Sequence, residues 1–311
     1  MPAYQKIRAQ HSLEEMFSTT ELIVEITCQP VEMLGVDAAI LFADILTLPK
    51  ETGFDIRFDK DLGPVINNPL RGISDLRRIS DLPPLDYQQK AIREIRERLP
   101  PECALIGFAG GPFTVLTYLI EGGSSLGFNK TLRFLVNQPR DFNAVMERLT
   151  DLTIAYLNQQ KEAGIEVFQI FDSWAGILRP AEYANFVLPH VQRIFESLDL
   201  PSIYFLKNCA HLMPWMAQCG AQFLSVCETV DIGTDPVLTA CGKGVQGNFY
   251  NQLFFADEAV IRQEVQRLLN KAAIYPQYIF NLNHGILPDT DPEKVRLVVD
   301  LVRKRRIPVI V

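Results

Sequence analysis

The sequence has no C-x-x-C pair, although it contains six cysteines. Zinc ribbons and dithiol redox sites both need closely spaced cysteines, so the spacing indicates neither kind of site. Reduced thiols are the expected state of all six, at positions 28, 103, 209, 219, 227 and 241.

Long apolar runs and an excess of positive charge are also missing. No apolar run reaches the roughly 20 residues that cross a bilayer, and residues 1–10 lack the apolar core of a signal peptide. The formal net charge is −7, whereas a surface that binds nucleic acid is basic. We therefore expect a cytoplasmic protein without membrane or nucleic-acid partners.

The G-x-S-x-G elbow of serine hydrolases and the G-x-x-x-x-G-K phosphate loop are both absent. Gly/Ser-rich linkers and low-complexity segments, which would separate domains, are absent as well. With 311 residues, of which 48% are hydrophobic and 22% charged, the chain is long enough to bury a large core. The sequence therefore predicts a single domain over residues 1–311.

The stretch Glu166–Gly176 joins a buried strand to a polar loop. Residues 167–171 are mostly apolar, which is typical of a strand covered on both faces. Polar residues and a glycine follow at 172–176, so this strand delivers reactive groups at its carboxyl end. A helical pattern that ends at Gly164 precedes the strand, and Pro180 opens the next helix.

The same alternation of helix and strand runs along the whole chain. It favours a (β/α)8 TIM-type barrel over an open doubly wound sheet, although the eighth strand is not assigned. Residues 54–58 and 64–66 indicate a small hairpin outside the main sheet, and Ser18-x-x-Glu21 is a capping-box pattern. Helices are predicted at 20–34, 86–99, 130–136, 212–219, 235–240, 257–272 and 292–304, and one begins at Pro112. Main-sheet strands are predicted at 36–41, 104–108, 167–171, 202–206, 223–226, 244–249 and 278–282, with 307–311 as a candidate terminal strand.

Polar residues follow four of these strands. The carboxyl ends of barrel strands meet on one face and carry the chemistry there, so we expect these side chains to converge. Each has a purely structural alternative. Asp44 would cap a turn and Tyr118 would be a core ring. Ser173 would cap a helix and His284 would be a loop histidine. The four signals are Asp44, Gly110-Gly111 with the nearby Tyr118, Asp172-Ser173, and Asn283-His284-Gly285.

A zinc site is a weaker hypothesis. Cys209 and His211 are two residues apart, but a structural zinc site needs two more ligands and a catalytic site at least one more. Cys219 and Cys227 are the available candidates, and small buried hydrophobes are the favoured interpretation of both. We therefore predict no metal ligand.

Five blocks of this sequence resemble the uroporphyrinogen decarboxylase family. The resemblance runs from Met1 to about Arg303 and implies a single (β/α)8 barrel that usually forms a homodimer. It also implies removal of carbon dioxide from the four acetate side chains of uroporphyrinogen, giving coproporphyrinogen, with no metal or organic cofactor. The blocks are VDAAILFADIL, GGPFTVLTYLIEGG, FQIFDSWAG, VQGN and FNLNHGILPDT, in this order.

The resemblance also implies roles for individual residues. Asp44 matches the family's essential carboxylate, which faces the pyrrole N–H groups of the substrate. Tyr118 matches its tyrosine, and these two are the expected catalytic residues. The expected substrate-binding residues are Asp44, Gly110, Tyr118, Phe171, Ser173 and His284, and the proton donor is not assigned.

The chain departs from the family pattern at its beginning. Family members carry an arginine-rich segment, R-Q-A-G-R-Y, which has no match before Met1-Pro2-Ala3-Tyr4. On this ground we expect the 311-residue chain to be weak or inactive, and an extension of about 10 to 20 residues with two arginines to restore turnover. Asn283 before His284 and the stretch 247–251 also differ from the family pattern.

Other cations are candidates for binding the substrate carboxylates, although none matches the family's arginine block. They are Arg71, Lys130, Arg133 and Arg179. Two alternative functions stay open at this point. One is a zinc-dependent methyltransferase of the cobamide or coenzyme M type, which shares the barrel. The other is an inactive, N-terminally truncated homologue.

Overall fold

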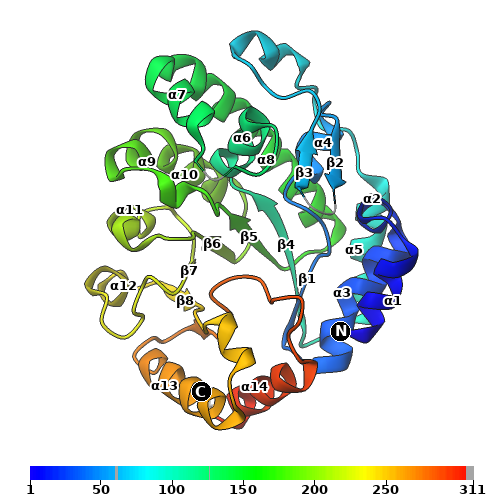
Figure 1. Ribbon diagram of the computed structural model, residues 1–311, viewed down its shortest axis with the longest axis vertical. Helices are drawn as coiled ribbons and strands as arrows, with labels where there is room; N and C mark the ends of the chain where they lie inside the picture. The colour runs from blue at the N-terminus through cyan, green and yellow to red at the C-terminus, as the bar shows by residue number, and fades with distance from the viewer. Residues whose placement is uncertain (60–61, 126, 306–311) are drawn as a thin grey trace.

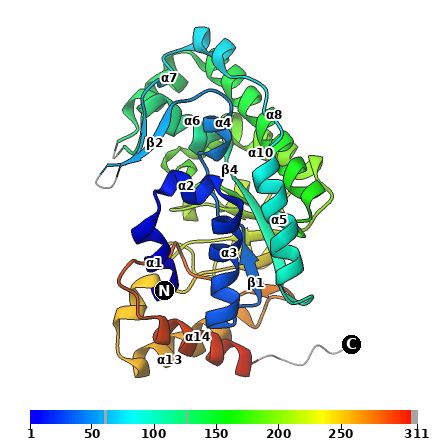
Figure 2. The same ribbon diagram turned by 90° about the vertical axis from the view of Figure 1, so that its right-hand side faces the viewer.

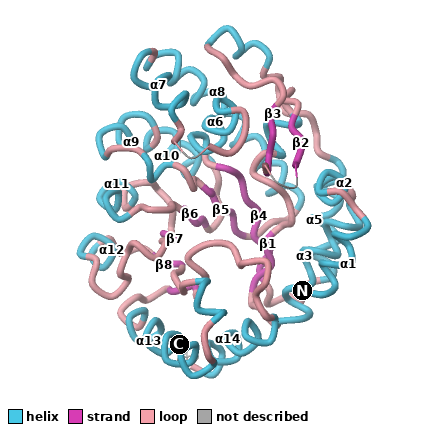
Figure 3. Tube along the Cα trace, viewed as in Figure 1, coloured by secondary structure: helices cyan, strands magenta, loops and turns pink. Residues whose placement is uncertain are grey.

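The computed structural model describes residues 1–59, 62–125 and 127–305. In this part of the chain, seven parallel strands form one curved sheet in the order β1-β4-β5-β6-β7-β8-β9. The strands surround the centre of the molecule and the helices lie outside them (Figures 1 and 3). The strands are β1 (Ala38–Ile40), β4 (Ala104–Gly110), β5 (Val167–Phe171), β6 (Ser202–Phe205), β7 (Phe223–Ser225), β8 (Gly244–Gln246) and β9 (Tyr278–Ile279).

The helices begin and end largely at residues that favour helix termini. Pro112, Pro139 and Pro180 each occupy a first-turn position, where the missing N–H of proline costs little. Gly35 and Gly164 end α3 and α8 in the left-handed conformation, which glycine adopts without strain. The helices are α1 (Pro2–Gln10), α2 (Leu13–Ser18), α3 (Thr20–Leu34), α4 (Thr47–Glu51), α5 (Asp86–Arg98), α6 (Pro112–Glu121), α7 (Asn129–Asn137), α8 (Pro139–Ala163), α9 (Pro180–Phe186), α10 (Leu188–Ser197), α11 (Met213–Met216), α12 (Pro236–Ala240), α13 (Glu258–Ala272) and α14 (Pro292–Lys304).

Side-chain alternation along β4 separates the outer core from the inner face of the sheet. Gly107 faces α8, because a Cβ atom there would lie 2.4 Å from Gln160 Oε1 and 2.5 Å from Ile165 Cδ1. Phe108 therefore points to the inner face, where its ring centroid lies 5.4 Å from that of Phe171. Deeper on the same face the contacts are polar, since Gln246 Nε2 donates to Gln169 Oε1 at 3.3 Å.

Helices α3 and α14 meet beside β1. Arg303 Nη2 lies 2.9 Å from Asp37 Oδ1, and Arg296 Nη2 donates to the Met33 carbonyl at 2.9 Å. Figure 2 shows α14 beside the lower end of α3. The helical layer is thus continuous from α14 to α3, whereas no strand pairing between β9 and β1 is seen within the described residues.

The seven predicted main-sheet strands are confirmed, and so is the separate hairpin of β2 (Ile56–Asp59) and β3 (Gly63–Ile66). The predicted capping box at Ser18 is wrong, because Thr19 is the N-cap of α3 and makes no side-chain cap. The capping box lies at Ser12 and Glu15, at the start of α2.

Three further predictions have mixed outcomes. The helix expected at 212–219 is shorter, with a 3-10 turn over Ala210–Leu212 followed by α11. The candidate strand 307–311 lies outside the described residues. Among the helices that the structure describes, none is long and apolar enough to span a bilayer.

Candidate active site

A row of rings lines the inner face of the sheet at the carboxyl ends of its strands. The ring centroid of Phe171, at the end of β5, lies 5.4 Å from that of Phe108 in β4 and 5.8 Å from that of Phe205 in β6. The Phe205 ring is 6.2 Å from the imidazole of His284, which follows β9. The row forms a mostly apolar wall that spans neighbouring strands and suits a flat, largely apolar ligand.

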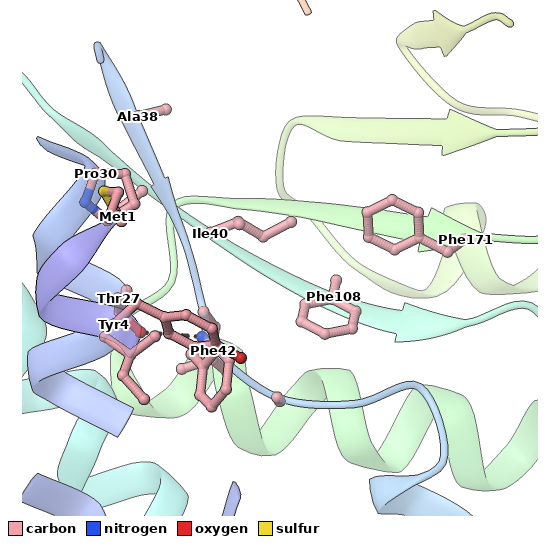
Figure 4. Close-up of a pocket in the computed structure, with 13 residues that line it drawn as sticks. Met1, Tyr4, Thr27, Pro30, Ala38, Ile40, Phe42, Phe108 and Phe171 are labelled. Atoms are coloured by element: carbon pink, nitrogen blue, oxygen red, sulfur yellow. Dashed lines mark hydrogen bonds between the residues drawn. The ribbon is translucent and has the colours of Figure 1, made fainter. Parts of the chain in front are cut away.

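A cavity of about 380 Å³ begins at this wall and extends toward the first helix. Figure 4 shows Ile40, Phe108 and Phe171 on one side of it and Tyr4 and Phe42 on the other. Ile40 is 42% exposed, which is unusual for an apolar residue in a strand of a parallel sheet. An apolar space of this size can accept part of a ligand that rests on the ring wall.

Asp44 lies just beyond β1, next to the residues that line this cavity. Its Oδ1 accepts the N–H of Leu46 at 2.8 Å, so the structural alternative of a turn cap is correct for this oxygen. Its Oδ2 accepts no hydrogen bond from the residues that the structure describes. Burial raises the pKa of the Asp44 carboxyl, and the Leu46 N–H opposes this rise. Asp44 is thus a partly desolvated carboxylate with one oxygen available to a ligand.

Tyr118 lies on α6, half-buried and close to Asp44. Burial raises the pKa of its phenol, and the negative charge of Asp44 adds to the rise. The Tyr118 ring centroid lies 6.2 Å from that of Trp174, which follows β5. The structure therefore brings these two predicted catalytic residues together, with the Trp174 indole beside them.

Gly110 and Gly111 are explained by packing rather than by close approach of a ligand. A Cβ atom on Gly110 would lie 2.7 Å from Val115 Cγ2 and 3.0 Å from Ile45 Cβ. A Cβ atom on Gly111 would lie 2.4 Å from the carboxyl carbon of Asp172. The Gly111 N–H is also occupied, since it donates to the Phe171 carbonyl at 2.8 Å. Gly110 thus supports the site from behind, by letting Ile45 and α6 approach β4.

Asp172 is a buried anchor for the loop that carries Ser173. Its Oδ1 accepts the N–H and the hydroxyl of Thr114 at 3.0 and 2.6 Å, and its Oδ2 accepts the hydroxyl of Tyr204 at 3.1 Å. The Thr114 hydroxyl in turn accepts the N–H of Trp174 at 3.0 Å. The carboxylate therefore ties the β5 loop to the start of α6.

Ser173 itself is half-buried in this loop. Its hydroxyl makes no hydrogen bond to any described residue, and it does not cap the short helical turn Ala175–Ile177, whose N-cap is Trp174. The structural alternative of a helix cap is therefore wrong for Ser173. The hydroxyl is available to a ligand.

His284 lies exposed at the far end of the ring wall. Partial burial of its ring lowers the pKa of the imidazole, and the positive charge of Lys207 lowers it further. Lys207 follows β6, and its Nζ lies 5.9 Å from the centroid of the Trp174 ring. Sequence analysis missed Lys207, whose position directly after the predicted strand 202–206 was the only signal in the sequence.

The zinc hypothesis finds no support in the geometry. His211 Nε2 pairs with the Leu178 carbonyl at 2.9 Å, while Cys209 is buried beside Cys227. Among the described residues, no group of three or more His, Cys, Asp or Glu side chains could hold a metal ion. All six cysteines are free thiols, as predicted.

The cations that sequence analysis singled out lie apart from this site. Arg71, Lys130 and Arg133 line a second pocket of about 300 Å³, to which none of the predicted site residues contributes. Arg179 is exposed, and its Nε donates to Glu182 Oε1 at 3.0 Å. Sequence position alone could not distinguish these cations from Lys207.

Known proteins resemble this chain over nearly its whole length. A family model described as uroporphyrinogen decarboxylase (URO-D) matches residues 1–305. The uroporphyrinogen decarboxylase of Desulfotalea psychrophila is 42% identical, and the match covers 98% of this chain and 91% of that protein. The one of Thermus thermophilus is 39% identical, with 97% of this chain and 89% of that protein covered.

Solved structures share the fold at lower identity. A methyltransferase from Methanosarcina mazei superposes with a TM-score of 0.78 at 20% identity, covering 92% of this chain and 86% of that one. A B12-independent methionine synthase from Shewanella sp. superposes with a TM-score of 0.64 at 10% identity, covering 92% and 87%. These likenesses concern the fold alone. The family match and the relatives above go further and confirm the resemblance carried by the five sequence blocks: the chain belongs to the uroporphyrinogen decarboxylase family.

Proposed function

We propose that this chain removes carbon dioxide from the four acetate side chains of uroporphyrinogen III and releases coproporphyrinogen III. The observation that carries the proposal is the pairing of an apolar ring wall with the Asp44 carboxylate at one edge of it. A porphyrinogen has the matching shape, with an apolar macrocycle, pyrrole N–H groups at its centre and carboxylates on its rim. Family membership and the names of the relatives point to the same reaction in porphyrin biosynthesis.

Asp44 supplies the electrostatic part of the reaction. A pyrrole acetate loses carbon dioxide readily only after its ring is protonated, because the resulting cation accepts the electron pair that carbon dioxide leaves behind. A carboxylate that accepts the pyrrole N–H groups holds the macrocycle and stabilises this cation. The desolvation that raises the pKa of Asp44 also strengthens its interaction with a cation, since both effects come from the low local dielectric.

The other site residues bind the rim and the faces of the substrate. Tyr118 and Ser173 hydrogen-bond acetate oxygens. The Ser173 hydroxyl makes no competing hydrogen bond to a described residue. His284 contacts another carboxylate of the rim. Phe171 supports the macrocycle through the ring wall, and Gly110 supports the cleft from behind at the end of β4, where it allows Ile45 and α6 to approach.

The proposal includes a closed (β/α)8 barrel that works as a homodimer in the cytoplasm, without metal or organic cofactor. The contact between α14 and α3, which makes the helical layer continuous, supports closure of the barrel. Sedimentation of the purified protein tests the homodimer, because the expected mass is about twice the 35.2 kDa of one chain.

Product analysis tests the proposed reaction. The protein is incubated anaerobically with uroporphyrinogen III, and the porphyrins are oxidised and separated by their number of carboxyl groups. We expect four carbon dioxide molecules per substrate and a tetracarboxylate product. A folded protein that leaves the octacarboxylate unchanged at high enzyme concentration contradicts the proposal.

A zinc-dependent methyltransferase is the second candidate, favoured only by the fold shared with the Methanosarcina mazei protein. Zinc analysis and activity after treatment with a strong chelator separate the two functions. The decarboxylase proposal predicts less than stoichiometric zinc and unchanged turnover. One zinc per chain, with methyl transfer that the chelator abolishes, supports the methyltransferase instead.

A further inference from the structure

The substrate proposed above carries carboxylates around its rim, whereas this chain has a net charge of −7. Binding therefore needs positive charge placed locally in the cleft. The basic residues considered in sequence analysis lie in a second pocket or pair with an acid, as Arg179 does with Glu182. A cation that faces the ring wall must come from another position.

Lys207 lies at that position. It follows β6, which is three strands along the sheet from β1 and therefore from Asp44. Its charge lowers the pKa of His284, whose ring packs against Phe205 at the end of the wall. Lys207 thus lies close to both Trp174 and His284, beside the ring wall.

The backbone around Lys207 is held rigidly. A Cβ atom on Gly176 would lie 2.0 Å from the Lys207 carbonyl oxygen, so the β5 and β6 loops are pressed together at this point. Asn208 adopts a left-handed conformation with φ 54°, and its N–H donates to Cys227 Sγ at 3.1 Å. These contacts fix where the Lys207 side chain leaves the backbone.

The ammonium of Lys207 has an aromatic neighbour but no acidic partner. Its Nζ lies over the Trp174 ring at 5.9 Å, which orients the side chain without neutralising its charge. Within the described residues, no carboxylate oxygen lies within 4.0 Å of this nitrogen. Glu228 is an acidic residue close enough to influence His284, but its Oε2 accepts the Asn283 side chain at 2.7 Å.

We propose that Lys207 is a substrate-binding residue whose ammonium holds one rim carboxylate of the tetrapyrrole, between Trp174 and His284. This assignment rests on the function proposed above. Lys207 is half-buried and its ammonium has no acidic partner among the described residues, so its charge is available to a substrate carboxylate. Lys207 and His284 then have different roles in binding. Lys207 supplies the positive charge, and the neutral imidazole of His284 supplies a hydrogen bond.

Charge-removing and charge-keeping variants test the assignment. Lys207→Met keeps the length of the stem over Trp174 and removes the charge, whereas Lys207→Arg keeps the charge. Lys161→Met is the matched control, since Lys161 is also half-buried but lies in the last turn of α8, at the amino end of β5. KM and kcat for uroporphyrinogen III are measured for each protein, with folding checked by circular dichroism.

The loss of one charged hydrogen bond that is made equally in the bound state and the transition state raises KM and spares kcat. For Lys207→Met we expect KM to rise about 10- to 100-fold, with kcat within about three-fold of the parent. Lys207→Arg and Lys161→Met should keep KM within about three-fold of the parent value. If the Met variant does not fold, Lys207→Gln replaces it with the same expectation.

Binding of oxidised uroporphyrin III, followed by fluorescence, keeps this test independent of turnover. The proposal predicts that Kd rises only in the variants that lose the charge, and that added salt reduces the difference. It is overturned if Lys207→Met leaves both KM and Kd within two-fold of the parent, or if the Met and Arg variants weaken binding equally. A parent protein that binds uroporphyrin through Lys207 but makes no product contradicts the proposed reaction and not this assignment.

Discussion

Asp172 is a fully buried carboxylate whose oxygens accept three hydrogen bonds, from the Thr114 N–H, the Thr114 hydroxyl and the Tyr204 hydroxyl. Removal of an acceptor leaves buried donors unsatisfied, at about 1–3 kcal/mol each. We therefore predict that Asp172→Ala lowers the free energy of unfolding by about 3–5 kcal/mol. Urea unfolding measures this change, and a loss below about 1 kcal/mol contradicts the anchoring role.

The same residue makes stability depend on pH. Burial raises the pKa of Asp172 from 3.8 to about 6. The folded state therefore binds more protons than the unfolded state between these two values, so stability falls as pH rises through this window. Relative to Asp172→Asn, the parent should lose on the order of 3 kcal/mol between pH about 4 and about 8. If the free energies of unfolding of the two proteins change by the same amount between these pH values, the pKa of Asp172 is not raised in the folded state.

Some residues of the candidate site could be predicted from the sequence and one was missed, and the reason for each outcome differs. Asp44 and Tyr118 were predictable as neighbours, because Asp44 follows one strand and Tyr118 lies on the helix after another, and the carboxyl ends of parallel strands share one face. Lys207 was missed because a lysine after a strand is usually solvated, and only the Trp174 ring and the absence of a nearby described acid distinguish it. Gly110 was predicted, but the packing against Ile45 depends on a contact that one sequence does not reveal.

At the scale of elements, the loops after β5 and β6 work as one unit. Gly176 belongs to the first loop and presses against the carbonyl of Lys207 in the second. We predict that Gly176→Ala forces the loops apart, lowers the free energy of unfolding by about 1–3 kcal/mol and raises KM for uroporphyrinogen III. Thermal unfolding and steady-state kinetics measure the two effects.

Gly72→Ala is the control for this variant, because no atom lies within 4 Å of the position that its Cβ would take. It should change neither stability nor KM. A Gly176→Ala protein as stable and as active as the control would show that the two loops are not coupled.

Element boundaries were predictable where single residues mark them. Pro112 and Gly164 mark a helix start and a helix end, and both agree with the structure. The start of α2 was missed, because Ser12 and Glu15 form a capping box in a helix too short to show apolar periodicity. The helix at 212–219 was predicted too long, since apolar side chains there pack into the core without forming regular turns.

At the scale of the molecule, alternating strands and helices predicted the parallel sheet and its order, because each crossover returns the chain to the next strand. The sheet has seven strands in the described part of the chain, and helices α3 and α14 meet beside β1. The sequence could not predict this contact, which depends on one ion pair and on a hydrogen bond from the Arg296 side chain to a backbone carbonyl far away in the sequence. The joined helical layer holds β1, and with it Asp44, against the ring wall.

Asp44→Asn tests this arrangement most directly. The substitution keeps the shape and the hydrogen bond to Leu46 but removes the charge that we propose faces the pyrroles. Because burial raises the pKa of Asp44, the charged form costs folding stability at neutral pH, so the variant should unfold at the same temperature as the parent or a higher one. Asp199→Asn is the control, since Asp199 is exposed before β6 at the amino edge of the sheet.

The decisive measurement is kcat for uroporphyrinogen III decarboxylation by Asp44→Asn, compared with the parent and with Asp199→Asn. We predict a loss of about 100-fold or more for Asp44→Asn with an unchanged or higher Tm, and no loss for the control. An Asp44→Asn protein that folds and turns over within a few-fold of the parent would contradict the central role of this carboxylate.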